Sequence, residues 1–100
     1  MSLSTHVLDT VAGRPAAGVA LELRRDGELV AEAVTDDDGR HAFGAVEAGE
    51  YELVFAVGDH FGTREFLDRI PVRFRIADAA AKYHVPLLVS PWAYSTYRGS

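Results

Sequence analysis

Apolar and polar side chains alternate with a period of two along most of the chain. In residues 71–77, Val72, Phe74 and Ile76 are separated by arginines, and residues 18–24 and 51–57 carry similar apolar stripes. Successive side chains of a strand point to opposite faces of a sheet, so this period predicts strands with one buried face. The spacing of an amphipathic helix is absent from most of the sequence.

Turn residues separate the alternating runs. Asp26-Gly27 and Asp38-Gly39 each supply a glycine for the positive φ that tight turns need. A short helix is expected within residues 58–68, where alternation stops, and a loop with a helical turn is expected at residues 77–82. The predicted strands lie near residues 3–8, 17–24, 28–35, 40–43, 50–57, 71–77, 84–90 and 93–98. About eight short strands at this spacing predict an all-β protein, specifically a β-sandwich.

The size and composition of the chain are those of one folded unit. It has 100 residues, of which 48% are hydrophobic and 25% are charged. This balance is typical of globular proteins, and the length is common for a domain. Because no repeat or linker interrupts the sequence, we expect residues 1–100 to form a single domain.

Charge and cysteine content narrow the classes of partner and chemistry. Ten Lys and Arg oppose fifteen Asp and Glu, a formal net charge of −5, which disfavours binding to nucleic acids and anionic membranes. The absence of cysteine removes disulfides, thiolate nucleophiles and thiolate metal ligands. Residues 1–6 lack the basic start and apolar core of a secretory signal, and no stretch approaches the roughly 20 apolar residues of a membrane span. We therefore expect a cytoplasmic location.

The four histidines are the first candidates for proton transfer, because histidine titrates near neutral pH. His6 lies mid-strand on the same face as Ser4 and Leu8, and His84 lies near the start of a later strand. For each of these two, a packing or surface role is the alternative, and the residues alone do not decide it. His41 and His60 adjoin turn residues, so we interpret both as solvated surface side chains.

Other familiar catalytic and binding motifs are missing. His6 and His84 have neither metal-binding spacing nor an obvious third ligand. The run Asp36-Asp37-Asp38-Gly39 resembles the start of a calcium loop, but its glycine is fourth where an EF-hand needs it sixth, so a solvated turn is expected. No Gly-x-Ser-x-Gly elbow or phosphate-binding glycine loop occurs. The sequence therefore predicts neither a metal nor a cofactor.

Arg40 and the end of the chain are the remaining candidates. Arg40 follows the acidic turn, where its guanidinium is suited to a planar, acidic ligand, although such arginines are usually surface residues. The predicted last strand runs almost to Ser100, whose α-carboxylate is ionised at neutral pH. From the residues alone, a placed terminus and a frayed one are equally consistent with this pattern.

Taken together, four motifs resemble those of the transthyretin-like family of 5-hydroxyisourate hydrolases. They are Leu3-Ser4-Thr5-His6-Val7-Leu8-Asp9, Thr35-Asp36-Asp37-Asp38-Gly39-Arg40, Tyr83-His84-Val85-Pro86-Leu87-Leu88 and Ser95-Thr96-Tyr97-Arg98-Gly99-Ser100. The histidine pair combined with the Tyr-Arg-Gly-Ser ending is the most specific part, and the resemblance covers nearly the whole chain. Asp36, Trp92-Ala93 and the short segment between Arg40 and Tyr51 depart from the family pattern.

The resemblance implies a transthyretin-like (prealbumin-like) sandwich of about eight strands, assembled as a homotetramer with active sites between dimers. It also implies cofactor-free ring opening of 5-hydroxyisourate to 2-oxo-4-hydroxy-4-carboxy-5-ureidoimidazoline, a step of urate (purine) degradation. His6, Arg40 and His84 are then expected to be catalytic, and the residues expected to contact the substrate are His6, Arg40, Tyr97, Arg98 and Ser100. His6 is slightly preferred over His84 as the general base, and the Ser100 carboxylate is expected to orient a histidine.

A non-catalytic module is the alternative. Residues 13–53 also resemble prealbumin-like modules of surface proteins, which bind or space other domains. Such a module has no need for His6, His84 and the Tyr-Arg-Gly-Ser ending together, so the hydrolase is the favoured interpretation.

Overall fold

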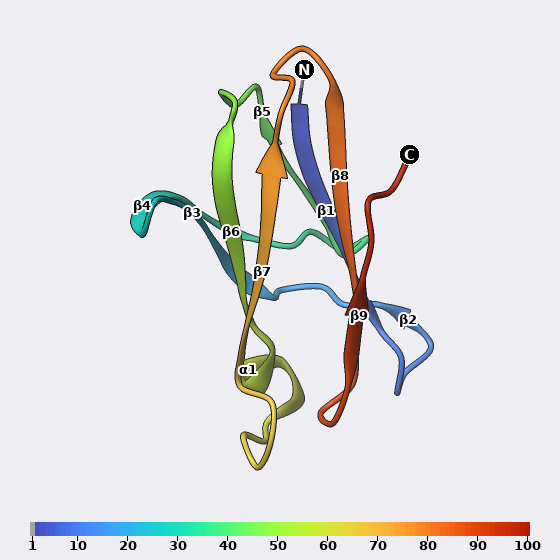
Figure 1. Cartoon of the computed structure of the whole chain (residues 1–100). Coiled ribbons are helices and arrows are strands. Elements are labelled where there is room, and N and C mark those ends of the chain that lie inside the picture. The colour runs from blue at the N-terminus through green and yellow to red at the C-terminus, as the bar shows by residue number, and fades with distance from the viewer. Residues whose placement is uncertain (1) are drawn as a thin grey trace.

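The alternating segments form strands in a computed structural model, which describes residues 2–100. Within that range there are nine strands and one helix (Figure 1). They are β1 (Ser2–Asp9), β2 (Arg14–Pro15), β3 (Ala20–Arg25), β4 (Glu28–Val34), β5 (Arg40–Gly44), β6 (Gly49–Ala56), α1 (Val57–Phe61), β7 (Arg69–Ile76), β8 (Lys82–Val89) and β9 (Tyr94–Thr96). No helix in residues 2–100 has the length and apolar character to cross a membrane.

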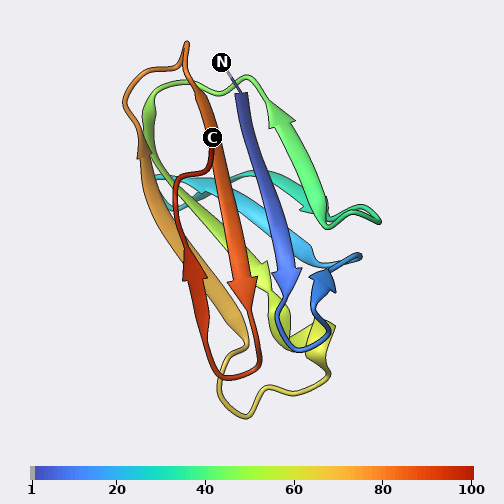
Figure 2. The ribbon, with the colours of Figure 1, turned by 90° about the vertical axis from the view of Figure 1, so that its right-hand side faces the viewer.

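The strands form two sheets that face each other. One sheet has the order β4-β3-β6-β7, with antiparallel neighbours throughout. In the other, β1 pairs in parallel with β8 on one side and antiparallel with β5 and β2 on the other, and β9 extends the sheet beyond β8. Figure 2 shows β1 and β8 side by side with β5 and β9 flanking them. The predicted β-sandwich is confirmed.

The core lies between the sheets, where the apolar stripes of the sequence meet. On β1 the odd-numbered residues from Leu3 to Asp9 are buried, while the even-numbered ones are only partly buried. The largest fully buried side chains include Phe55, Leu53, Ile70 and Leu87. The alternation along β1 therefore turns Ser4 and His6 to the outer face of their sheet.

The predicted elements differ from the observed ones mainly at their ends. The second predicted strand starts at residue 20, because residues 17 and 18 form a turn. The helix starts at residue 57, which had been assigned to a strand. The last strand ends at Thr96, and beyond it the backbone of the chain pairs with β8 again in a bridge between His84 and Gly99. The two-residue β2 was too short to predict.

Candidate active site

Strand register brings the two candidate histidines and Arg40 together. On β1, Ser4 lies opposite His84 of β8, and His6 lies opposite both Pro86 of β8 and Arg40 of β5. Because opposite residues of paired strands share a face, all of these side chains stand on the outer surface of the sheet. Residues from three separate segments of the sequence thus converge.

A cavity of about 350 Å³ opens at this place. Its lining comes from β1, β5, β8, the acidic turn and the end of the chain: Ser4, Thr5, Asp36, Arg40, His41, Ala42, Lys82, His84 and Ser100. Of the predicted site residues, Arg40, His84 and Ser100 line it. His6 lies beside it in register.

A larger hollow, about 500 Å³, lies over the opposite sheet and is lined by charged side chains of β3, β6 and β7. There Arg73 Nε lies 2.9 Å from Glu52 Oε2, and Arg24 Nε lies 3.0 Å from Glu22 Oε1. Arg24 and Arg73 are thus each paired with a carboxylate, and no histidine is among the lining residues. The smaller cavity is therefore the better candidate for chemistry.

His84 is held in a defined orientation and is easily kept neutral. Its Nδ1 lies 2.8 Å from the hydroxyl oxygen of Ser4. Burial lowers the pKa of His84, and the positive charges of Arg40, His6 and Lys82 lower it further. A neutral imidazole whose Nδ1 is engaged by Ser4 has Nε2 available to exchange a proton.

His6 carries an unsatisfied ring nitrogen. Its Nε2 is buried and has no hydrogen-bond partner within the part of the chain that the structure describes. Buried polar atoms are normally paired, and exceptions concentrate at functional sites. A positive charge on His6 also contributes to the lowered pKa of His84.

The acidic turn fixes the backbone that carries Arg40. Asp36 Oδ1 accepts hydrogen bonds from the N–H groups of Asp38 and Arg40, each at 2.9 Å. The N–H of Arg40 is the main cause of the lowered pKa of Asp36. Gly39 takes φ +74° and its carbonyl accepts the N–H of Val7 at 2.7 Å. The turn is thus attached to β1 beside His6.

The last four residues of the chain lie at two different cavities. The N–H of Gly99 donates to the carbonyl of His84 at 2.7 Å, and Ser100 lines the cavity. Tyr97 and Arg98 instead line a second, apolar cavity between β7 and β8. In this conformation they lie outside the cavity that contains His84.

The interpretation of His41 and His60 as solvated surface side chains is wrong. His41 is partly buried and lines the cavity, with its ring 4.6 Å from that of Phe43. The side chain of His60 is 21% exposed, and its Nε2 lies 2.9 Å from Asp9 Oδ2 at the far end of β1. Neighbouring turn residues suggested exposure, whereas the partner of His60 comes from a distant segment of the chain.

Sequence reasoning also missed Ser4 and Lys82. Ser4 shares the strand face of His6, which was the available signal, but its place opposite His84 depends on the pairing of β1 with β8. Within residues 2–100, no group of three histidine or acidic side chains is arranged to hold a metal ion.

Known proteins resemble this chain over nearly its whole length. A 5-hydroxyisourate hydrolase of Deinococcus radiodurans is 47% identical, and the alignment covers 98% of this chain and 95% of that protein. The structure of Klebsiella pneumoniae 5-hydroxyisourate hydrolase superimposes with a TM-score of 0.90 at 40% identity, covering 100% of both chains. Sea bream transthyretin in complex with thyroxine gives a TM-score of 0.86 at 30% identity, covering 97% of this chain and 93% of that one.

A family model provides the same assignment independently of any single relative. The model of the HIUase/Transthyretin family matches residues 3–99. That range includes His6, Arg40 and His84, which the fold gathers at one face. The chain belongs to the HIUase/Transthyretin family.

Proposed function

We propose that this chain is a cofactor-free hydrolase that opens the ring of 5-hydroxyisourate to 2-oxo-4-hydroxy-4-carboxy-5-ureidoimidazoline, in urate degradation. The observation that carries the proposal is the cavity in which His84, with its lowered pKa, stands beside Arg40. The relatives named 5-hydroxyisourate hydrolase support the choice of substrate.

His84 is proposed as the general base. In the tautomer that we propose for catalysis, the neutral ring carries its proton on Nδ1, which donates to the Ser4 oxygen, and the lone pair of Nε2 is free. Water attacks a ring carbonyl carbon, gives a proton to Nε2, and a tetrahedral oxyanion forms. When the C–N bond breaks, the proton passes from the histidine to the leaving nitrogen. The geometry thus favours the histidine that was second choice from the sequence.

Arg40, His6 and Lys82 surround this base with positive or protonatable groups. Arg40 lines the cavity, and its fork of donors suits the carbonyl edge of the substrate and the oxyanion that develops. His6, with its unpaired Nε2, is proposed to share the proton transfer. Burial, together with the charges of Arg40 and Lys82, also keeps His84 neutral, which a base requires.

The tail completes the proposed site. Ser100 lies on the cavity wall, so it is within reach of a bound substrate. That the Ser100 carboxylate orients a histidine stays a prediction. For His84, Nδ1 is already engaged by the hydroxyl of Ser4. Substrate contact by Tyr97 also stays a prediction, because its 60% exposed side chain must meet the ligand from outside the cavity described above.

We also propose that residues 1–100 act as one hydrolase domain that forms a homotetramer in the cytoplasm, with active sites at the interface between dimers. The aromatic side chains of Tyr94 and Tyr97, 44% and 60% exposed beside the tail, offer apolar surface for such contacts. Light scattering coupled to size-exclusion chromatography tests the assembly. A tetramer supports it and a monomer at micromolar concentration contradicts it.

A non-catalytic binding module is the competing function. Sea bream transthyretin shows that this fold also binds a small molecule, thyroxine. A binding module does not need two neighbouring histidines, one of which has a lowered pKa, next to an arginine. The placement of His6, Arg40 and His84 on one face of the sheet therefore favours the hydrolase.

The test is to generate 5-hydroxyisourate in place with urate oxidase and to follow its decay by absorbance. The proposal predicts that catalytic amounts of this protein accelerate the decay many-fold. Decay at the spontaneous rate would overturn the hydrolase and favour the binding module.

A further inference from the structure

The side chain of Arg98 packs against β8 instead of extending into the cavity. Its guanidinium carbon lies 4.1 Å from the centre of the Tyr83 ring, and Nη2 donates to the carbonyl of Lys82 at 3.1 Å. A planar guanidinium is attracted to an aromatic face and still has donors free at its edge. Arg98 is thus attached to the two residues that directly precede His84.

Tyr83 is a fixed platform for this stacking. It is only 8% exposed, and its hydroxyl accepts the N–H groups of Ala77 and Asp78 at 3.1 and 3.3 Å. Those N–H groups belong to the segment that joins β7 to β8. The ring therefore cannot shift without breaking its hydrogen bonds to this connection, so Arg98 is held on a rigid support.

The next residue of the tail packs directly on the imidazole of His84. The N–H of Gly99 donates to the His84 carbonyl at 2.7 Å, and a Cβ at Gly99 would lie 2.6 Å from His84 Cδ2. Upstream, the hydroxyl of Thr96 donates to the carbonyl of Pro86 at 2.7 Å. Between these attachments, Arg98 provides the contact of the tail with Tyr83 and Lys82.

We propose that Arg98 is a positioning residue, which holds Gly99 and Ser100 against the His84 ring by stacking on Tyr83. This inference rests on the proposed function, in which His84 is the base. The tail then limits rotation of the imidazole and shields one of its edges from water. In contrast to the substrate contact expected from the family resemblance, this role operates before any substrate binds.

Kinetic variants separate the two roles. Arg98→Gln should lower kcat about 10- to 100-fold, with a smaller change in KM, because a displaced base mainly affects the chemical step. Arg98→Lys keeps the charge but loses the planar guanidinium that stacks on Tyr83, so its kcat should be nearly as low as that of Arg98→Gln. Tyr83→Leu should resemble Arg98→Gln, whereas Tyr83→Phe keeps the ring but loses the hydroxyl that fixes it, so its kcat should lie between those of the wild type and Tyr83→Leu. Combining Arg98→Gln with Tyr83→Leu should lower kcat no further than the worse single change.

A measurement on the free protein gives a readout without turnover, so it is independent of whether the hydrolase proposal holds. In an NMR titration, Arg98→Gln should shift the ring signals of His84 and change its pKa, because a loosened tail both exposes the imidazole and removes the Ser100 carboxylate from the cavity. Arg40, His6 and Lys82 still face the ring and should keep part of the lowering. Arg73→Gln, at an 86% exposed arginine of β7, is the control and should change neither quantity.

If Tyr83→Leu does not fold, Gly99→Ala replaces it, because its Cβ has to displace the tail from His84. This variant should change the His84 signals as Arg98→Gln does. Unchanged signals and pKa of His84 in Arg98→Gln would overturn the proposal, and so would a normal kcat in folded Tyr83→Leu.

Discussion

The hydroxyl oxygen of Ser4 lies 2.8 Å from Nδ1 of His84, although the two residues are 80 positions apart in the sequence. The parallel pairing of β1 with β8 places them directly opposite each other. This contact selects the ring nitrogen that faces the strand and leaves the other one for chemistry.

Removing the Ser4 hydroxyl should impair catalysis more than folding. Ser4→Ala leaves Nδ1 of His84 without its partner, so both the tautomer and the ring orientation become less defined. We expect kcat to fall roughly 10- to 100-fold, less than the ~100- to 10,000-fold contribution of a whole acid–base group, because the imidazole itself remains. The decay of 5-hydroxyisourate measures kcat, and Ser4→Thr, which keeps a hydroxyl, is the matched control. Wild-type turnover in Ser4→Ala would remove Ser4 from the account.

The pKa of His84 should respond to the positive charges around it. Arg40→Gln and Lys82→Gln each remove a cation that disfavours the protonated ring, so both should raise the pKa, Arg40→Gln by more. In the wild type, protonation should occur below the ordinary value of about 6.5, and activity should fall over that acidic range. NMR titration of the ring measures the shift.

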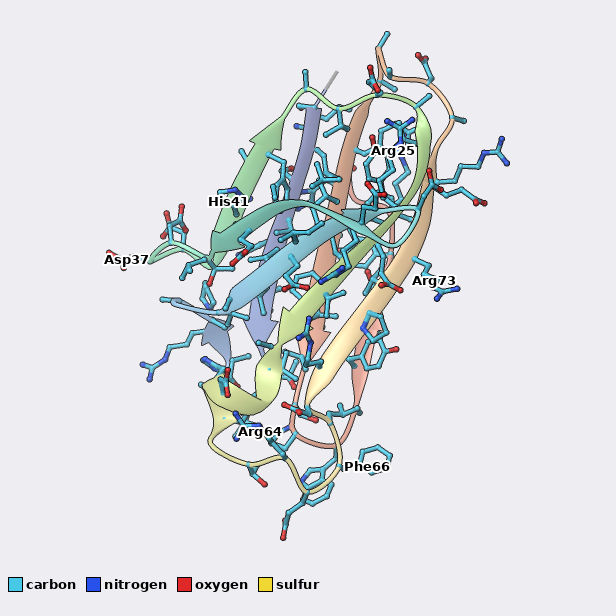
Figure 3. The ribbon with its side chains drawn as sticks, turned by 90° about the vertical axis from the view of Figure 1, so that its left-hand side faces the viewer. Arg25, Asp37, His41, Arg64, Phe66 and Arg73 are labelled. Atoms are coloured by element: carbon cyan, nitrogen blue, oxygen red, sulfur yellow. The ribbon has the colours of Figure 1, made fainter. Side chains whose placement is uncertain are left out.

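Arg64→Gln is the control for this titration. Figure 3 shows Arg64 near the helix, at the other end of the molecule from His41, a residue of the cavity wall. Its guanidinium interacts with Asp59 and Asp68. An equal shift in Arg64→Gln would mean that net charge, rather than the local cations, sets the pKa of His84.

The strands and the candidate residues could be predicted from the sequence, whereas the pairing of the strands and the contacts between the residues could not. Alternation is a local property, so it revealed which face His6 occupies. The register between β1 and β8 depends on the packing of the whole sandwich, and without it Ser4 could not be connected to His84. The exposure of His60 was mispredicted for the same reason, because its partner Asp9 is 51 positions away in the sequence. Arg98 was assigned through its motif, which carries no information on its stacking partner.

The pair of Asp9 and His60 should stabilise the fold in a pH-dependent way. Burial disfavours the Asp9 carboxylate, but the N–H of Ala12, the ring of His60 and the N–H of Val11 together lower its pKa. A lowered pKa in the folded state contributes stability above the unfolded value of about 3.9 and loses it as pH falls through the folded value. Asp9→Asn should therefore cost about 1–3 kcal/mol at neutral pH, and this cost should shrink in acid.

Urea unfolding at neutral and acidic pH measures this difference. Asp37→Asn, at an exposed carboxylate of the acidic turn, is the control and should stay within about 0.5 kcal/mol of the wild type. A cost of Asp9→Asn that does not change with pH would argue against a role for the ionised carboxylate.

Two glycines with similar backbone angles should differ in their tolerance of a side chain. Gly13 and Gly39 have φ of +72° and +74°, but a Cβ meets nothing within 4 Å at Gly13 and would lie 2.5 Å from the Val7 carbonyl oxygen at Gly39. Gly13→Ala should cost about 1 kcal/mol for the left-handed conformation alone. Gly39→Ala should cost roughly 3 kcal/mol or more, because overpacking is added.

Thermal or urea unfolding compares these two variants. Gly39→Ala should also lower activity at temperatures where it remains folded, because the turn that carries Arg40 has to move away from β1. Equal stability of the two variants would show that the contact of the turn with β1 does not constrain Arg40.

The most direct test of the central claim compares His84→Ala with His60→Ala in the decay of 5-hydroxyisourate, with both proteins confirmed as folded. His84 lines the cavity, whereas His60 lies at the far end of β1 in a pair with Asp9. We predict that His84→Ala loses about 100-fold or more of kcat, the range of one acid–base group, while His60→Ala stays near wild type. Near-wild-type turnover by His84→Ala would contradict the assignment of this cavity as the active site.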